Sequence, residues 1–292
     1  MLLLTPQNWQ NYQLIDCGGF EKLERFGRYV LRRPEPQAIW DKSLPDADWE
    51  RADAFFSKDK GSLEKGQWLM NKGMEERWFM GYKHAQIDLQ LKLALSSFKH
   101  VGLFPEQAEN WDYINEKIRE MPLAKPKVLN LFAYTGGASL VAKQAGADVT
   151  HVDSVKQVIS WSRENMDASG LTDIRWVVED AMKFVRREAK RGNRYNGLIL
   201  DPPAYGRGPE GEKWQLEEQI NEMLKICAEL LDDQHFFFII NLYSLGLSAM
   251  IVDNLVKCSF GQVPNPQYGE LYLSDTFQKR LPLGVFYRFS SK

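Results

Sequence analysis

The chain has 292 residues, of which 44% are hydrophobic, and its formal net charge is -2 at pH 7. A chain of this length can bury a full core, and its near-neutral charge gives no global attraction to nucleic acid, although a local basic face is compatible with it. Three widely spaced cysteines without CxxC pairing indicate neither a disulfide framework nor a zinc site, and they fit a reducing cytoplasm. The N-terminal MLLLTPQNWQ lacks the basic region of a signal peptide, and no apolar run approaches the roughly 20 residues that span a bilayer. We therefore expect a cytoplasmic protein that holds no metal and does not enter a membrane.

Residues 1–95 are expected to form a small β-rich domain, because turn residues alternate there with short runs such as RYVLRR and RWFMGY. Five of the nine tryptophans lie in this part, and we assign them to its core, since a small sheet needs bulky side chains inside it. They are Trp9, Trp40, Trp49, Trp68 and Trp78. A cluster of arginines is interpreted as a solvated face. It comprises Arg25, Arg28, Arg32 and Arg33.

Residues 96–292 are expected to form a second domain in which strands alternate with helices. Short apolar runs predict strands at 127–132, 147–153, 174–180, 196–201 and 235–241. Helical spacing predicts helices at 139–146, 155–169, 181–192 and 212–231. A final pair of strands, 269–275 and 284–290, is joined by too few residues for a helical crossover and should be antiparallel. The predicted fold is α/β, with a Rossmann-like, seven-stranded, mostly parallel sheet whose last strand is reversed, plus the small N-terminal β-rich region.

Polar residues follow the predicted strands, at the edge where open α/β sheets bind ligands. The turn AYTGGAS follows the first strand, Asp153 the second and Asp180 the third. Asp201 follows the fourth, and two prolines end that strand abruptly. A single Asp at a strand end is as often a turn former or a helix cap. Three of them on one edge, beside a Gly-Gly turn, favour a shared ligand.

The chemistry of this edge points to a ligand without phosphate. Neither G-x-G-x-x-G nor a P-loop is present, and carboxylates repel phosphate. S-adenosylmethionine has hydroxyl groups and a positive charge, so its ribose can bond Asp153 and its adenine amino group can bond Asp180. Asp153 follows Gly136 at about the separation that an acid-to-ribose contact has in the dinucleotide fold. NAD is the alternative ligand and ranks well below S-adenosylmethionine.

The motifs NLFAYTGGAS, THVDSV, VEDAMKF and LILDPPAYG, in this order and spacing, resemble those of class I S-adenosylmethionine-dependent methyltransferases. More narrowly, they are similar to the group containing the bacterial 23S rRNA cytosine-5 methyltransferases and the guanine-N7 half of the bifunctional large-subunit rRNA methyltransferase. The segment LSSFKHVGLFPEQAENWDYI (95–114) also resembles the part that precedes the sheet in that group and closes over the cofactor. The resemblance extends over about residues 70–290.

The resemblance implies a cofactor site at the strand ends. The residues that it places in the turn after the first strand, beside the methionine portion, are Phe132, Ala133, Tyr134, Thr135, Gly136 and Gly137. Those that it places at the other strand ends are Asp153 and Ser154 near the ribose, Asp180 and Ala181 near the adenine, and Asp201 at the methyl end. Gln107 and Asn110 contribute from the upstream segment.

Two departures from this group shape the expected reaction. The N-terminal region does not match the pseudouridine-synthase-associated RNA-binding domain that the rRNA cytosine-5 enzymes usually carry. The cysteine that attacks C6 of cytosine is also missing, since the matching stretch after the fifth strand reads INLYS (240–244). Cys227 is expected to be a buried hydrophobe in helix 212–231, and Cys258 to lie in a late connector. The chain is therefore not expected to be a cytosine-5 methyltransferase of the covalent type.

A nitrogen acceptor needs no covalent help, because its lone pair attacks the methyl group directly. By similarity to amino-methylating enzymes with Asp/Asn-Pro-Pro-aromatic motifs, Asp201 and Pro202 would accept hydrogen bonds from the target nitrogen, and Tyr205 would stack on an unpaired base. The expected substrate is RNA, and the resemblance implies ribosomal RNA. A protein or small-molecule acceptor, and a cofactor-binding module without catalysis, stay as alternatives.

Two further segments bear on RNA recognition. The glycine-rich stretch 206–214 is expected to be a mobile substrate loop. The basic run KFVRREAKRGNR (183–194) is interpreted as the solvated face of a helix whose buried side holds Phe184, Val185 and Ala189.

Overall fold

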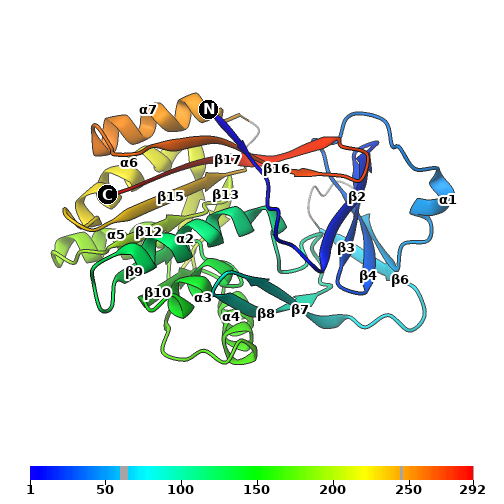
Figure 1. Cartoon of the computed structure of the whole chain (residues 1–292), viewed down its shortest axis with the longest axis horizontal. Coiled ribbons are helices and arrows are strands. Elements are labelled where there is room, and N and C mark those ends of the chain that lie inside the picture. The colour runs from blue at the N-terminus through cyan, green and yellow to red at the C-terminus, as the bar shows by residue number, and fades with distance from the viewer. Residues whose placement is uncertain (60–64, 244–245, 292) are drawn as a thin grey trace. The chain divides into compact units, whose positions relative to one another are not determined.

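The computed structural model describes residues 1–59, 65–243 and 246–291, and these form two compact units (Figure 1). The large unit comprises Met1–Leu4, Gln107–Leu271 and Leu283–Lys292, and the small unit comprises Thr5–Glu106 and Tyr272–Pro282. Each unit is thus assembled from separate stretches of the chain. A boundary of independently folding domains between residues 95 and 96 stays a prediction.

The large unit is built on an eight-stranded sheet. In sheet order, its strands are β1 (Leu2–Leu4), β16 (Gln267–Ser274), β17 (Arg280–Ser290), β15 (Phe237–Leu242), β12 (Gly197–Leu200), β9 (Lys127–Leu131), β10 (Asp148–Asp153) and β11 (Arg175–Val178). The five strands from β15 to β11 pair in parallel, and β17 is antiparallel to β15. The seven-stranded α/β prediction with its reversed last strand is confirmed. The eighth strand, β1, pairs in parallel with β16 and was not predicted as part of this sheet.

Helices cover both faces of this sheet. They are α2 (Ala108–Glu120), α3 (Gly137–Gln144), α4 (Lys156–Ala168), α5 (Ala181–Lys190), α6 (Leu216–Leu230) and α7 (Ala249–Phe260). Leu129 and Leu131 of β9 share a buried core with residues of α5, α6 and α7. Between them, Asn130 points to the opposite face and donates a hydrogen bond to Ser139 of α3 at 2.9 Å. The alternation along one buried strand thus separates the two helical layers.

The structure corrects three of the sequence predictions. The helix expected at 212–231 begins at Leu216, because residues 213–215 form the short strand β14 (Lys213–Gln215). Its partner is β13 (Tyr205–Arg207), so the expected loop 206–214 is a β-hairpin with Gly211 in the left-handed region at its turn. Cys258 lies in α7 and not in a connector. Within the described residues, no helix is long and apolar enough to cross a membrane.

The small unit contains the predicted β-rich structure. Its five-stranded sheet has the order β2 (Tyr12–Gly18), β3 (Glu21–Phe26), β4 (Tyr29–Pro34), β5 (Ala54–Lys58) and β6 (Gly66–Met70). A two-stranded ribbon follows, β7 (Arg77–His84) and β8 (Ile87–Ala94). The helix α1 (Asp46–Trp49) and the 3-10 turn η1 (Pro105–Gln107) complete the elements. Trp49 and Trp78 are buried as predicted, whereas the other three tryptophans of the region are partly exposed.

The arginine cluster of this unit is not a uniform solvated face. Arg33 is 4% exposed and forms an ion pair with buried Glu24 at 2.6 Å. Tyr12 donates a second hydrogen bond to Glu24 at 2.8 Å. The prediction was wrong at Arg33 because it counted the charges without assigning each one to a face of β4, whose side chains alternate between the two faces.

Candidate active site

The turn between β9 and α3 adopts an uncommon backbone conformation. Phe132, Tyr134 and Gly136 have φ angles of 54°, 48° and 92°. Two of the three are not glycine, and such residues are rare in the left-handed region unless the surrounding structure holds them there. Strain of this kind gathers at ligand-binding sites.

Helix α4 supplies the restraints on this turn. Ser162 donates a hydrogen bond to the carbonyl of Tyr134 at 2.7 Å, and Asn165 donates one to the carbonyl of Thr135 at 2.9 Å. Gly136 is also the N-cap of α3, whose first residue is Gly137. The first turn of a helix offers free backbone N–H groups, so the turn presents donors at the edge of the sheet.

Asp153 is the last residue of β10, and its side chain bonds to the same turn. Its Oδ2 accepts a hydrogen bond from the backbone N–H of Tyr134, and its Oδ1 accepts one from Val155, both at 2.9 Å. Burial raises the pKa of Asp153, and these backbone donors offset only part of that rise. Each oxygen keeps a lone pair, so the carboxylate can still accept bonds from a ligand's hydroxyl groups. Ser154 follows directly and is partly exposed.

Asp180 is the N-cap of α5. It is 8% exposed, and its Oδ1 accepts a hydrogen bond from the backbone N–H of Lys183 at 2.9 Å. The helix-cap interpretation therefore accounts for one carboxylate oxygen. Gly208 in the β13–β14 hairpin lies close by, since a Cβ atom built on it would be 3.0 Å from Cβ of Asp180. Ala181 is buried at the first position of the helix.

Asp201 ends β12 and meets the upstream segment in a polar network. Gln107 approaches Oδ2 of Asp201 at 3.5 Å through its Nε2, which also donates to the hydroxyl of Tyr243 at 2.7 Å. Asn110 donates to Oε1 of Gln107 at 2.8 Å and lies 3.4 Å from Oδ1 of Asn241. The structure thus brings together two predicted residues and a predicted carboxylate that are about a third of the chain apart. Asn241 and Tyr243 were absent from the predicted site, although their place after the fifth strand was a signal for them.

Asn241 carries an unused donor. The side chain is 1% exposed, and its Nδ2 has no hydrogen-bond partner among residues 1–59, 65–243 and 246–291. A buried amide donor without an acceptor is costly, so its presence at the sheet edge marks a polar site.

Tyr205 stands at the start of the hairpin that follows the two prolines. Pro202 is buried, and the carbonyl of Pro203 accepts a hydrogen bond from the indole of Trp214 at 2.7 Å. The ring of Tyr205 is 54% exposed, and its hydroxyl accepts a 3.3 Å hydrogen bond from Arg207. The side chain that packs this loop is thus Trp214, which is buried, and the ring of Tyr205 faces solvent.

The β13–β14 hairpin also contacts the turn between β9 and α3. The ring of Trp214 packs against the ring of Phe132 with centroids 4.8 Å apart. Lys183 of α5 forms ion pairs with Glu210 at 2.6 Å and Glu212 at 3.7 Å in the hairpin turn. The hairpin therefore connects the end of β12 with the regions around Phe132 and Asp180.

None of the three cysteines belongs to the strand ends or turns of the candidate site. Cys227 is buried in α6, as predicted, and burial raises the pKa of its thiol to about 12. Cys258 is exposed on α7, and Cys17 belongs to β2 of the small unit. Ser244, the last residue of the stretch that matches the family's cysteine turn, lies outside the described residues.

Helix α5 shows that the basic run is mostly paired. Arg186 forms an ion pair with Glu222 at 2.6 Å, and Arg187 pairs with Glu179. Phe184 is fully buried beneath them. The interpretation as the solvated face of a helix is confirmed. In the described part of the chain, no group of three or more acidic, cysteine or histidine side chains is placed to hold a metal ion.

Comparisons with known proteins fit this arrangement. The crystal structure of the S-adenosylmethionine-dependent methyltransferase from Agrobacterium tumefaciens is 36% identical, has a TM-score of 0.92, and is matched over 100% of this chain and 94% of that one. The chain belongs to the S-adenosylmethionine-dependent methyltransferases. S-adenosylmethionine is therefore the methyl donor of this methyltransferase. A methyltransferase complexed with SAH matches with a TM-score of 0.72 and 17% identity, which shows the shared fold alone.

Curated relatives match the methyltransferase over part of its length. Ribosomal RNA large subunit methyltransferase K/L of Shewanella frigidimarina is 31% identical over 147 residues, which are 49% of this chain and 20% of that protein. Ribosomal RNA large subunit methyltransferase I of Aeromonas salmonicida is 29% identical over 160 residues, or 54% of this chain and 38% of that protein. The chain thus spans less than half the length of these curated relatives. No protein-family model matches it.

Proposed function

We propose that the strand-end residues of the large unit bind S-adenosylmethionine. The donor set fits this ligand, because Asp153 keeps lone pairs for ribose hydroxyls and Asp180 uses only its Oδ1 in the helix cap. The turn Phe132–Gly137 would border the methionine portion, with Ser154 and Ala181 beside the two carboxylates. The unused amide donor of Asn241 supports a polar ligand at this edge. The bound cofactor supplies an electrophilic methyl group.

We further propose that the acceptor atom is a nitrogen. The observation that carries this proposal is the carboxylate of Asp201, which Gln107 approaches and which exposed Tyr205 follows closely in the sequence, together with the lack of a cysteine in the motif after β15. A nitrogen lone pair forms the new N–CH₃ bond as the S–CH₃ bond breaks. Asp201 and the carbonyl of Pro202 would orient the acceptor by accepting its N–H bonds, and Tyr205 would stack on the ring. Gln107 and Asn110 act by positioning Asp201.

The proposed substrate is RNA in the cytoplasm. Support comes from the relatives whose names give ribosomal RNA of the large subunit as substrate, and from an exposed aromatic ring beside the Asp-Pro-Pro motif. A protein or small molecule is the alternative acceptor. A module without catalysis is the third possibility, and the retained acid and ring argue against it.

The test is transfer of labelled methyl groups from S-adenosylmethionine to RNA from cells that lack the gene. Nucleoside mass spectrometry should find the label on a nitrogen of one base. Label on C5 of cytosine would overturn the direct-attack proposal. Label on protein, with none on RNA, would support the alternative acceptor.

Two variants locate the methyl-transfer end. Asp201→Ala should lower kcat by about 100-fold, because alanine cannot accept the N–H bond that orients the acceptor, while the dissociation constant of S-adenosylmethionine changes little. Asp148→Ala is the matched control, since Asp148 is an exposed aspartate at the start of β10, away from the strand ends. Equal activity of Asp201→Ala and the wild-type enzyme would remove Asp201 from the reaction.

A further inference from the structure

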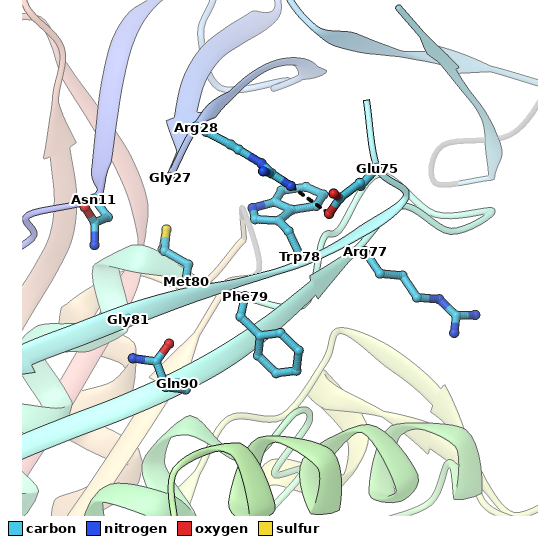
Figure 2. Close-up of a pocket in the computed structure, with 10 residues that line it drawn as sticks. All are labelled: Asn11, Gly27, Arg28, Glu75, Arg77, Trp78, Phe79, Met80, Gly81 and Gln90. Carbon is cyan, nitrogen blue, oxygen red and sulfur yellow. Dashed lines mark ion pairs between the residues drawn. The ribbon is translucent and has the colours of Figure 1, made fainter. Parts of the chain in front are cut away.

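The β7–β8 ribbon of the small unit has one buried and one open face. Side chains alternate along β7, so Trp78, Met80 and Tyr82 are buried while Arg77 and Phe79 are exposed. Figure 2 shows Trp78 and Met80 on one side of the ribbon and Phe79 pointing away from them. The buried side chains fix the register, and the open face therefore has a defined arrangement.

Phe79 is the centre of this open face. Its ring is 53% exposed, and the ring makes no aromatic contact with the described residues. Lys92 of β8 lies directly across the ladder from it, and Gln90 faces Gly81 in the next pair. An aromatic ring on a β surface with cations on both sides is the arrangement by which proteins stack bases and hold the adjoining phosphates.

The charges of the ribbon are also suited to a polyanion. Asp88 is the one acid in the sequence between residues 77 and 94, and it pairs with Lys83 at 2.7 Å. Arg77 forms no ion pair with any described residue, and Lys92 lies on the same face of the ribbon. Between residues 77 and 94, the three cations Arg77, Lys83 and Lys92 stand against the one acid, so this stretch is formally positive, although Glu75 and Glu76 precede it directly.

A hollow of about 660 Å³ runs along β7 beside this face (Figure 2). Residues from both sides of the strand line it, among them Arg77, Phe79 and Trp78. At its rim, Arg28 pairs with Glu75 at 2.7 Å. The hollow gives an extended chain room to pass along the strand edge.

We propose that the β7–β8 ribbon binds single-stranded RNA, with a base stacked on Phe79 and phosphates contacted by Arg77 and Lys92. This inference rests on the proposed RNA substrate and gives the small unit a role in holding it. Base stacking and phosphate contacts affect the salt dependence of RNA affinity differently. Loss of the ring weakens binding without changing its salt dependence, whereas loss of a phosphate contact flattens the dependence of affinity on salt.

The test uses fluorescence anisotropy of the full-length protein with a labelled oligouridylate at several salt concentrations. Phe79→Ala and Phe79→Leu should each bind about 5- to 150-fold more weakly with an unchanged salt slope, and Phe79→Tyr should bind like the wild-type protein. Arg77→Gln should reduce the salt slope by about 0.7. Phe55→Ala and Arg51→Gln are matched controls, because both residues are exposed in the same unit.

Calorimetry with S-adenosylmethionine and circular dichroism show whether each variant is folded. If the Phe79 and Arg77 variants bind the oligonucleotide like the controls while the wild-type enzyme methylates RNA, the ribbon proposal fails and the proposed function stands. If the wild-type protein neither binds nor methylates RNA, both proposals fail. Equal losses in Phe79→Leu and Phe79→Tyr would exclude stacking.

Discussion

Asp153 combines partial burial with two backbone hydrogen bonds, and this makes it the most informative single residue of the proposed cofactor site. Asp153→Asn should weaken S-adenosylmethionine binding by about 10- to 100-fold, because hydrogen bonds to a charged acceptor are worth roughly 1.5–3 kcal/mol. Calorimetry measures the change. Asp148→Asn on the same strand should leave the affinity unchanged, and equal losses in both variants would contradict a specific contact.

The raised pKa of Asp153 also predicts how cofactor affinity depends on pH. The ionised carboxylate is the form that accepts two hydroxyl donors, and burial raises its pKa above the ordinary value of an aspartate. Affinity should therefore fall on acidification, beginning at a higher pH than an ordinary aspartate would cause. Binding titrations across pH 4 to 7 should show this component in the wild-type protein. In Asp153→Asn it should be absent.

Glu24 and Arg33 form a buried ion pair whose loss should be costly to the small unit. Glu24→Gln leaves the guanidinium of Arg33 buried without a counter-charge, so it should lower the free energy of unfolding by about 3–5 kcal/mol. Glu21→Gln is the matched control, because its pairs with Arg32 and Lys42 are partly exposed and should each be worth about 1 kcal/mol or less. Chemical denaturation followed by tryptophan fluorescence compares the two. Similar losses would contradict the assigned role of burial.

The same pair predicts a pH dependence with a definite sign. Burial acts to raise the pKa of Glu24, but the charges of Arg33 and Lys22 outweigh it and hold the pKa below its ordinary value. The stabilisation is thus complete above the unfolded-state pKa of about 4.3 and is lost as the pH falls through the lower folded-state pKa. The stability difference between the wild-type protein and Glu24→Gln should stay constant above pH 5 and shrink below pH 4.

At the scale of elements, the packing of α3 against α2 fixes Gly137, where the turn after β9 ends and α3 begins. A Cβ atom on Gly137 would lie 2.5 Å from the ring of Trp111, which is 4% exposed and has little room to move. Gly137→Ala should therefore destabilise the large unit by about 1–3 kcal/mol through overpacking and weaken cofactor binding with it. In Gly206→Ala the nearest contact would be an ordinary 3.6 Å, so this control should be neutral. Thermal unfolding with and without S-adenosylmethionine measures both effects.

Some helices and strands could be predicted from the sequence pattern, and others could not. Strands β9, β10, β11, β12 and β15 and helices α3 to α6 were predictable, because continuous apolar runs and helical spacing repeat along the chain. The turn at Phe132 and Tyr134 was predictable as a turn but not in its conformation, since neither residue is one that favours the left-handed region. Strand β1 escaped prediction because three apolar residues gain strand structure only by pairing with β16.

The candidate site also had a predictable part and a part that only the structure shows. Residues at strand ends could be placed from the order of the motifs, because parallel strands bring their carboxyl ends to one edge. The bonds that join Gln107 to Asp201 and Tyr243 depend on tertiary contacts between residues that are distant in the sequence. The hairpin β13–β14 was predicted as a loop, because a glycine-rich stretch is equally typical of loops.

For the whole molecule, ligand-induced stabilisation is the broadest test of the cofactor assignment. A ligand that binds only the folded state adds about 2.7 kcal/mol at a concentration 100 times its dissociation constant. S-adenosylmethionine and S-adenosylhomocysteine should therefore both raise the unfolding temperature of the large unit, by an amount that grows with ligand concentration. NAD should not, because the turn after β9 lacks the G-x-G-x-x-G pattern whose glycines let backbone N–H groups approach a pyrophosphate.

The Asp153→Asn variant makes this test specific to the site. Its shift with S-adenosylmethionine should be smaller than that of the wild-type protein at every concentration, and the difference should correspond to the loss of affinity measured by calorimetry. Differential scanning calorimetry of the full chain can also separate the two units, if they unfold in separate transitions. A shift with NAD equal to that with S-adenosylmethionine, or an undiminished shift in Asp153→Asn, would contradict the proposed binding mode, because either result would mean that the carboxylates at the strand ends do not select the ligand.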